Sequence, residues 1–182
     1  MSKIFVISAA SGSGKTTLCR RLLKESKGLV VSKSFTTRPR RSGERNKRDY
    51  IFVSKKEFLE ARKNGRFLEW AKVFDNFYGT PIDFVDKTIK KGKSVLLIID
   101  VQGAFKVKKK RPNAVLIFIM PPSLDELKRR LIHRKSDGPK QIKLRFKIAR
   151  REMAQSSRYD HIVINKTIEK AVKQLKNIVG AR

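Results

Sequence analysis

Residues 9–16 read Ala-Ala-Ser-Gly-Ser-Gly-Lys-Thr, between the apolar run Ile4–Ile7 and a helix-like run that begins at Thr17. A strand that ends in small residues and turns directly into a helix leaves several backbone N–H groups pointing into one concave loop, where the helix dipole also favours negative charge. Lys15 would then reach the terminal phosphates of a nucleoside triphosphate, and the Thr16 hydroxyl would hold Mg²⁺. The stretch therefore predicts a phosphate-binding loop.

The first position of this loop departs from the usual Walker A pattern, because Ala9 stands where that pattern has glycine. Alanine fits there if its backbone keeps a negative φ. The alternative is a Gly/Ser-rich turn without a ligand, which the order of strand, loop, Lys-Thr and helix disfavours.

The composition predicts one domain in a reducing compartment. The 182 residues are 40% hydrophobic, which suits a single globular core, and Cys19 is the one cysteine, so an internal disulfide is excluded. No segment approaches the roughly 20 apolar residues of a membrane span, and Ile4–Ile7 is too short for the apolar core of a targeting signal. We therefore expect a cytoplasmic protein that does not use a membrane, as a monomer or a small homo-oligomer.

The charge is strongly positive, with 45 Lys plus Arg against 16 Asp plus Glu, a net +29. The excess is concentrated in Arg38–Arg48 and Lys128–Arg151. This pattern favours a solvated basic surface on a protein with anionic substrates over a nucleic-acid reader, because neither zinc-ligand spacing, an RRM pattern nor a helix-turn-helix can be placed. We expect only weak, sequence-independent nucleic-acid binding at low salt, which fades as salt rises.

The order of elements predicts an α/β fold. Val95–Ile99 and Val115–Ile119 are apolar without polar alternation, as in parallel strands that are covered on both faces. Strands are expected at about 3–8, 29–36, 94–100, 114–120 and 161–164, and helices at about 15–26, 82–91, 103–110, 123–134, 139–156 and 167–179. Residues 36–54 interrupt this alternation, and Tyr50–Val53 is interpreted as an antiparallel strand of a smaller inserted lobe.

The inserted lobe carries a second group of polar residues. Arg38 and Arg41 could surround a phosphate monoester together with the hydroxyls of Tyr50 and Tyr78. Glu69 could accept from the N1–H and N2 amino groups of guanine, whereas adenine presents an acceptor at N1. The alternatives are that both arginines belong to the general basic surface and that Glu69 is one end of a surface ion pair.

Six motifs in this order together resemble the guanylate kinase family over nearly the whole chain. They are Ser-Ala-Ala-Ser-Gly-Ser-Gly-Lys-Thr-Thr (8–17), Ser-Phe-Thr-Thr-Arg-Pro-Arg-Arg-Ser-Gly-Glu (34–44), Phe-Leu-Glu-Trp-Ala (67–71), Tyr-Gly-Thr (78–80), Ile-Asp-Val-Gln-Gly-Ala (99–104) and Pro-Pro-Ser-Leu-Asp-Glu-Leu-Lys-Arg-Arg-Leu (121–131). The resemblance implies a three-layer α/β/α P-loop core (about 1–32, 89–124 and 156–182), a GMP-binding lobe (about 33–88) and a helical lid (about 125–155). It also implies Mg²⁺-dependent phosphorylation of GMP, and of dGMP, by ATP in purine nucleotide metabolism.

The resemblance also implies a role for each matching residue. On the GMP side, Ser34, Glu69 and Thr80 would meet the base, and Arg38, Arg41, Tyr50 and Tyr78 would hold the phosphate, with Asp100 nearby. On the ATP side it implies Ala9, Ala10, Ser11, Gly12, Ser13, Gly14, Lys15, Thr16 and Thr17, with Asn165 beside the adenine. Thr16 would hold the metal, and Arg134 and Arg145 resemble lid arginines that act on the transferring phosphate with Lys15, Arg38 and Arg41.

Three positions depart from the family pattern. Ile98 replaces the first acid of the strand end Asp-Ile-Asp, Ala10 replaces a common proline, and Lys47 stands where glycine is common. A catalytically inactive interaction module and a kinase for another phosphorylated small molecule are the alternatives. Retention of Lys15, Thr16 and both lid arginines, Arg134 and Arg145, argues against the module. The set of Ser34, Glu69 and Thr80 argues for guanine.

Overall fold

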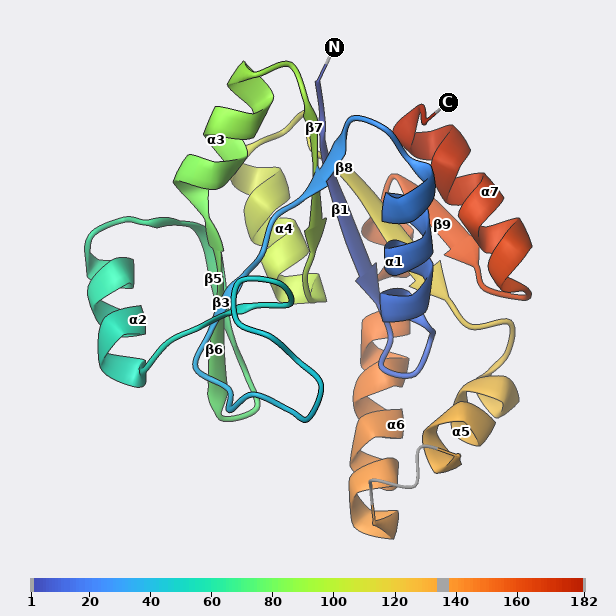
Figure 1. Ribbon diagram of the computed structural model, residues 1–182. Coiled ribbons are helices and arrows are strands. Elements are labelled where there is room, and N and C mark those ends of the chain that lie inside the picture. The colour runs from blue at the N-terminus through green and yellow to red at the C-terminus, as the bar shows by residue number, and fades with distance from the viewer. Residues whose placement is uncertain (1, 134–137, 182) are drawn as a thin grey trace.

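Two β-sheets organise the chain, and the larger one is parallel throughout (Figure 1). The computed structural model describes residues 2–133 and 138–181. The strand order of the large sheet is β2-β7-β1-β8-β9. Its strands are β1 (Ile4–Ala9), β2 (Leu29–Val31), β7 (Ser94–Ile98), β8 (Val115–Met120) and β9 (His161–Ile164). The expected parallel α/β fold is confirmed.

Helices cover both faces of this sheet (Figure 1). One face packs against α1 (Lys15–Glu25) and α7 (Ile168–Val179). The other face packs against a set of four helices, with the short 3₁₀ helix η1 (Ser156–Arg158) following the last of them. These four are α3 (Ile82–Lys90), α4 (Val101–Lys110), α5 (Leu124–Ile132) and α6 (Pro139–Met153).

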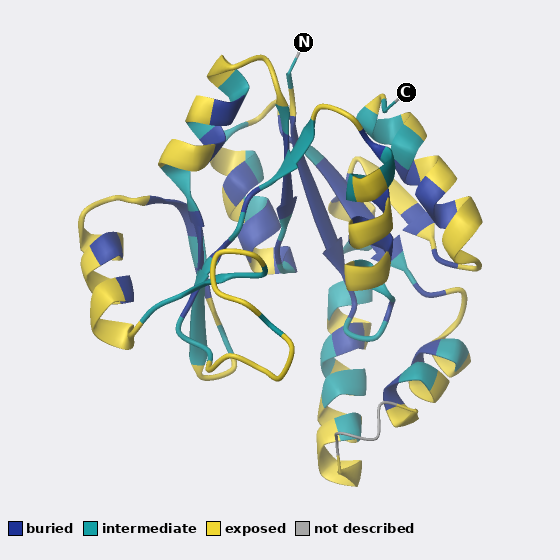
Figure 2. Cartoon of the chain, in the orientation of Figure 1, coloured by how far each residue is buried: buried dark blue, intermediate teal, exposed yellow. Residues whose placement is uncertain are grey.

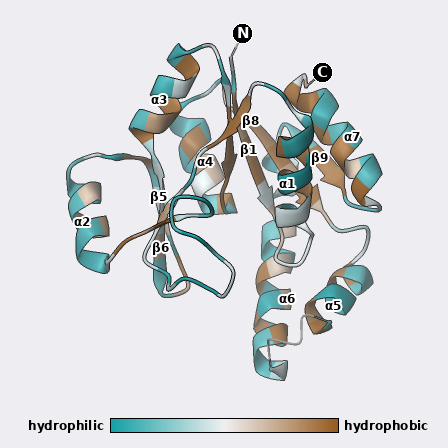
Figure 3. Ribbon diagram, in the orientation of Figure 1, coloured by the Kyte–Doolittle hydropathy of each residue, from teal (hydrophilic) through white to brown (hydrophobic). Residues whose placement is uncertain are grey.

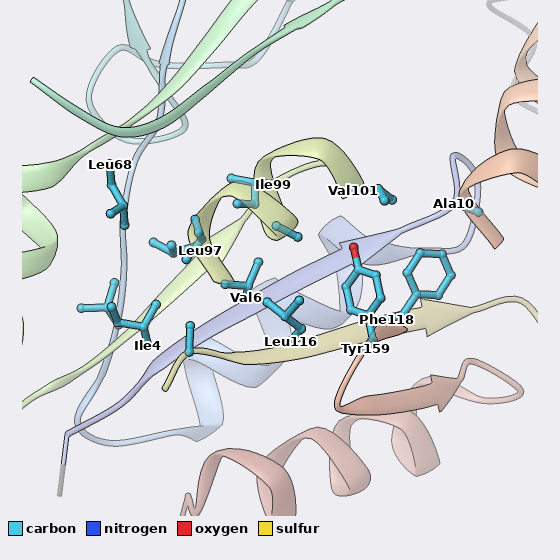
Figure 4. Close-up of a cluster of buried hydrophobic side chains, with 14 of the residues drawn as sticks. Ile4, Val6, Ala10, Leu68, Leu97, Ile99, Val101, Leu116, Phe118 and Tyr159 are labelled. Carbon is cyan, nitrogen blue, oxygen red and sulfur yellow. The ribbon is translucent and has the colours of Figure 1, made fainter. Parts of the chain in front are cut away.

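The main hydrophobic core lies between the sheet and those four helices (Figure 4). Val6 and Leu116 are fully buried at its centre, and the Tyr159 ring packs edge-on against Phe118, with 5.1 Å between the ring centroids. Figure 2 shows burial concentrated along the central strands, and Figure 3 shows the apolar character following the same strands. This placement explains why these strands lack polar alternation, since both of their faces are covered.

The smaller sheet has four strands in the order β4-β3-β6-β5. They are β3 (Phe35–Thr36), β4 (Ile51–Phe52), β5 (Phe67–Val73) and β6 (Asn76–Pro81), and α2 (Lys55–Lys63) packs beside them. Phe58 of α2 stacks on Phe67 and Phe77, with ring centroids 4.7 and 5.4 Å apart. This aromatic cluster gives the second sheet a hydrophobic core of its own.

Two strand predictions are wrong. The stretch 29–36 is not one strand, because β2 ends at Val31 and the chain then crosses to the second sheet, where Phe35 pairs with Gly79. The stretch 50–53 is not antiparallel, because β4 pairs in parallel with β3. A strand of two residues carries no signal for its direction, so the sequence could not distinguish the two arrangements.

No helix in the ranges 2–133 and 138–181 is both long enough and apolar enough to cross a bilayer.

Candidate functional site

The loop between β1 and α1 has the form that the sequence predicts. Gly14 occupies the N-cap of α1 in the left-handed region, at φ 86°, and a Cβ atom there would lie 2.6 Å from Nδ2 of Asn165. Only glycine meets both demands. Ala9 is not among the described residues with positive φ, so its backbone tolerates alanine.

Asn165, which follows β9, supports this loop. Its side chain is buried and its Nδ2 donates a hydrogen bond of 2.8 Å to the carbonyl of Ser13. Its backbone N–H donates to the carbonyl of Met120 at the end of β8. The Asn165 side chain therefore contacts the loop backbone, and the residue does not line the pocket that the loop opens into.

That pocket has a volume of about 860 Å³ and collects residues from five parts of the chain. Lys15 is one of its lining residues, and its Nζ donates to the carbonyl of Ile99 at 3.4 Å. The lining residues are Ala9–Thr17 from the loop, Lys72–Phe74 from the β5–β6 turn, Asp100–Gln102 from the start of α4, Arg130 from α5, and Arg145, Ile148, Arg151, Glu152 and Gln155 from α6 and the turn after it. The structure thus brings Lys15, Asp100 and Arg145 to one cavity, whereas Arg134 lies outside the described residues.

Glu152 is a pocket residue that the sequence interpretation missed. Its Oε2 accepts a hydrogen bond of 3.3 Å from the backbone N–H of Ser11, so a carboxylate takes up one of the loop amides. Burial raises the pKa of Glu152, and the charge of Lys15 opposes that rise. The signal was available, because Arg145 and Glu152 are seven residues apart and therefore share one face of α6.

Arg38, Tyr50 and Tyr78, which the sequence predicts to hold a phosphate monoester, lie together on the second sheet. The guanidinium of Arg38 lies 5.5 Å from the Tyr50 ring centroid, and the rings of Tyr50 and Tyr78 are in edge contact at 6.1 Å. Burial raises the pKa of the Tyr50 hydroxyl, which keeps it a neutral donor. Arg38 is thus part of a built cluster rather than of the general basic surface.

Glu44 holds this cluster together and was not assigned a role from the sequence. Its carboxylate accepts two hydrogen bonds from Nη2 of Arg38, at 2.8 and 3.0 Å, and one of 2.9 Å from the backbone N–H of Arg41. A carboxylate therefore binds the Arg38 guanidinium, which was expected to bind a phosphate. Nearby, Lys47 has φ 63°, a left-handed backbone that explains why glycine suits this position.

Glu69 lies on β5 opposite Thr80 of β6, and both side chains are buried. The Thr80 hydroxyl donates a hydrogen bond of 2.6 Å to Oε1 of Glu69. Burial raises the pKa of Glu69 to about 7, opposed chiefly by the bond from Thr80. The surface ion-pair alternative is therefore wrong, because Glu69 is only 4% exposed. Ser34, at the start of this sheet, is also buried.

Gly103, on α4, is a third residue that the sequence did not single out. A Cβ atom there would lie 2.7 Å from Oε2 of Glu69, so the helix meets the carboxylate where it has no side chain. Asp100 fixes the start of that helix, since its side chain accepts the Gly103 N–H at 3.0 Å. Asp100 also lines the pocket and its charge raises the pKa of Glu69, which places it between the two parts of the site.

Ile98, where the family pattern has an acid, ends β7. It packs against the hydrophobic cluster on the face of the sheet that α1 and α7 cover. The side chain contributes to the core there and offers no polar group to either part of the site.

Thr16 fits the requirements of a magnesium ligand. It is exposed in the first turn of α1 and lines the pocket together with Asp100. Hydroxyl and carboxylate oxygens that complement substrate phosphates are the donors that Mg²⁺ takes. No group of three or more His, Cys, Asp or Glu side chains that could hold a metal by themselves occurs within the described parts of the chain.

Comparison with known proteins connects this geometry to one family. A model of the family described as guanylate kinase matches residues 1–182. The chain is 44% identical over 178 residues to a guanylate kinase of Caldanaerobacter subterraneus subsp. tengcongensis, covering 98% of this chain and 86% of that protein. It is 46% identical over 177 residues to a guanylate kinase of Wolbachia sp. subsp. Brugia malayi, covering 97% and 91%. The crystal structure of guanylate kinase from Anaplasma phagocytophilum superposes with a TM-score of 0.83 at 38% identity, covering 98% of this chain and 85% of that one.

Proposed function

Because the chain belongs to the guanylate kinase family, we propose that it transfers the γ-phosphoryl group of ATP to GMP, forming ADP and GDP. The observation that carries the choice of base is the buried carboxylate of Glu69, held by Thr80. A single carboxylate can accept from the N1–H and the N2 amino group of guanine at once, whereas the N1 lone pair of adenine would repel it. Ser34 and Thr80 complete the base site.

The GMP phosphate is assigned to the cluster of Arg38, Arg41, Tyr50 and Tyr78. In the structure the Glu44 carboxylate already occupies the Nη2 of Arg38 and the N–H of Arg41. A phosphate carries more negative charge and more acceptor oxygens than a carboxylate, so it can replace Glu44 on these donors. We propose dGMP as a second acceptor, because the assigned contacts are to base and phosphate and none is to the ribose 2′-hydroxyl.

ATP is assigned to the pocket that the phosphate loop lines. The loop amides and Lys15 would hold its phosphates, and Asn165 belongs to this side through its contact with Ser13. Bound Mg²⁺, held by Thr16, supplies positive charge that offsets the developing charge of the transferring group. The Ser11 N–H becomes available to a phosphate once the carboxylate of Glu152 gives it up.

Phosphoryl transfer of this kind needs no side-chain nucleophile. The chain must align the acceptor oxygen of GMP with the γ-phosphate and surround the transferring group with positive charge. Lys15 and Arg145 line the donor pocket. Arg38 and Arg41, which contact Glu44 in the structure, are assigned to the acceptor. Arg134 is assigned with Arg145 to a lid at about 125–155, which would close with the GMP lobe at about 33–88 over the core and exclude water.

The setting of the reaction is also part of the proposal. We place it in purine nucleotide metabolism in the cytoplasm, which suits nucleotide substrates and the free, buried Cys19. We propose a monomer or a small homo-oligomer as the active form.

A coupled assay of ADP release with ATP and GMP tests this function. The expected result is GMP-dependent ADP release that requires Mg²⁺ and that Lys15→Ala abolishes. ADP release at the rate of the GMP-free control would contradict it, and phosphopeptide or GMP binding without turnover would instead indicate an interaction module.

A further inference from the structure

Strand β5, which carries Glu69, is the outer strand of the second sheet. Its inner edge pairs with β6, so the backbone groups on its outer edge have no strand to bind. The pairing is also irregular between Phe67 and Glu69, which places Leu68 at a β-bulge. A bulge re-aims the side chains next to it, and here it lies directly before Glu69.

Two lysines of α4 bind the outer edge of this strand. Nζ of Lys106 donates to the carbonyl of Trp70 at 2.6 Å, and Nζ of Lys110 donates to the carbonyl of Leu68 at 2.7 Å. The backbone carbonyls of the residues before and after Glu69 therefore each accept a hydrogen bond from a lysine ammonium group.

The spacing of the two elements matches at this contact. Residues four apart on a helix are about 6 Å apart along its axis, and residues two apart on a strand are about 6.8 Å apart, with their carbonyls on the same edge. Lys106 and Lys110 thus reach Trp70 and Leu68 in register, with helix and strand running in opposite directions. Gly103, three residues before Lys106, lies on the same helix face and meets the Glu69 carboxylate.

Lys106 makes two further contributions. Its Nζ lies 5.0 Å from the ring centroid of Trp70, so the ammonium holds both the backbone and the side chain of the residue after Glu69. Its charge also favours the ionised form of Glu69. The first effect restrains the position of the strand, and the second supports the protonation state that accepts from guanine.

We propose that Lys106 and Lys110 are positioning residues for base recognition, which fix β5 against α4 so that the Glu69 carboxylate is held at the guanine edge. This inference rests on the proposed guanine contact of Glu69. It extends the base site from side chains that touch GMP to two surface lysines that touch only the backbone beside it.

Steady-state kinetics of Lys106→Met and Lys110→Met test the proposal, with Lys109→Met as the matched control. Methionine keeps the unbranched side chain and removes the charged donor. Lys109 is exposed on the same helix, and its side chain makes no hydrogen bond or ion pair with another described residue. We expect each test variant to lose about tenfold in kcat/KM for GMP, the factor that one charge-assisted hydrogen bond gives. The loss should fall mainly on KM for GMP, with KM for ATP unchanged.

Two further readouts separate positioning from a general loss of structure. The preference for GMP over AMP should fall by the same factor, and the acid limb of kcat/KM for GMP should move to higher pH in Lys106→Met, because a charge that favours ionised Glu69 is gone. Lys106→Arg should restore both. If a methionine variant proves unfolded by its thermal transition, Lys106→Gln or Lys110→Gln takes its place in the same comparison.

Suppose that the unmutated protein prefers GMP but the test variants behave like Lys109→Met in all of these measurements. This result would overturn the proposal and leave the proposed function standing. An equal increase in KM for GMP and in KM for ATP would also overturn the proposal. An unmutated protein that does not distinguish GMP from AMP would overturn both, because the role of Glu69 would then be lost.

Discussion

The hydroxyl of Thr80 donates a hydrogen bond of 2.6 Å to Oε1 of Glu69, within a pair of strands where both residues are buried. The other carboxylate oxygen, Oε2, lies against Gly103 of α4. The carboxylate is thus oriented from two sides, and no cationic side chain within residues 2–133 and 138–181 bonds to it. A buried acid of this kind is costly to ionise, and such groups are concentrated at functional sites.

The first prediction is that Glu69 makes stability fall as pH rises. The folded pKa is about 7 and the ordinary value is 4.5, so between these values the folded state binds more protons than the unfolded state. The stabilising effect is complete below pH 4.5 and is lost as pH rises through 7. The unmutated protein should therefore lose roughly 3 kcal/mol of unfolding free energy between pH 4 and pH 8 that Glu69→Gln does not lose.

Denaturant unfolding of both proteins across this range measures the difference. Glu60→Gln, on the exposed side of α2, is the control and should show little change. A difference between Glu69→Gln and the unmutated protein that stays constant with pH would contradict the raised pKa.

Gly103→Ala should weaken GMP use while leaving the helix intact. The new Cβ would lie 2.7 Å from Oε2 of Glu69 and 3.2 Å from its Cδ, so the carboxylate must leave its position beside Thr80. Alanine is the better helix former by about 1 kcal/mol, so the helix itself should not suffer. We expect kcat/KM for GMP to fall about tenfold or more, with KM for ATP unchanged. An unchanged KM for GMP would show that the contact does not matter for binding.

Lys15→Ala should abolish turnover without unfolding the protein. The side chain is only partly buried and makes one long hydrogen bond to a backbone carbonyl, so little stability depends on it. Loss of a charge aimed at the transferring phosphate should lower kcat on the order of 10²-fold or more. Lys24→Ala, at the exposed end of the same helix, should keep its activity. Near-normal turnover in Lys15→Ala would refute the assignment of the loop.

Arg145→Ala should lower kcat far more than it changes the affinity for GMP. Arg145 lines the donor pocket from α6 and is not part of the cluster assigned to the GMP phosphate. Removing an interaction that forms only in the transition state of phosphoryl transfer lowers kcat without weakening substrate binding. Arg134→Ala is expected to behave in the same way, and Lys147→Ala on the exposed side of α6 should not. A change confined to KM for GMP would place Arg145 on the acceptor side.

The large sheet and the phosphate loop could be predicted from the sequence because their signals are local. β1, β7 and β8 each contain an unbroken run of at least four apolar residues, and the loop joins a strand directly to a helix. The second sheet could not be predicted in the same way. β3 and β4 have two residues each, and their pairing depends on partners far along the chain.

The site shows the same division. Residues whose chemistry is apparent from their type, such as Glu69 and Arg38, could be singled out in advance. Gly103 and Glu44 could not, because their importance comes from what lies beside them: a carboxylate for Gly103, and a guanidinium and a backbone N–H for Glu44. Glu152 was missed although its spacing from Arg145 places both residues on one face of α6. Ile98 could be singled out from the sequence because it departs from the family pattern, but its side chain packs against the hydrophobic core and not in the site.

The ratio of kcat/KM for GMP to that for AMP, measured on the unmutated protein with ATP as donor, tests the central claim most directly. A site that pairs a buried carboxylate with N1–H and the N2 amino group should reject the mismatched base by roughly 10⁴-fold. Glu69→Gln should lower kcat/KM for GMP far more than that for AMP. A strong preference for GMP that depends on Glu69 is the predicted result, and comparable values for GMP and AMP in the unmutated protein would contradict it.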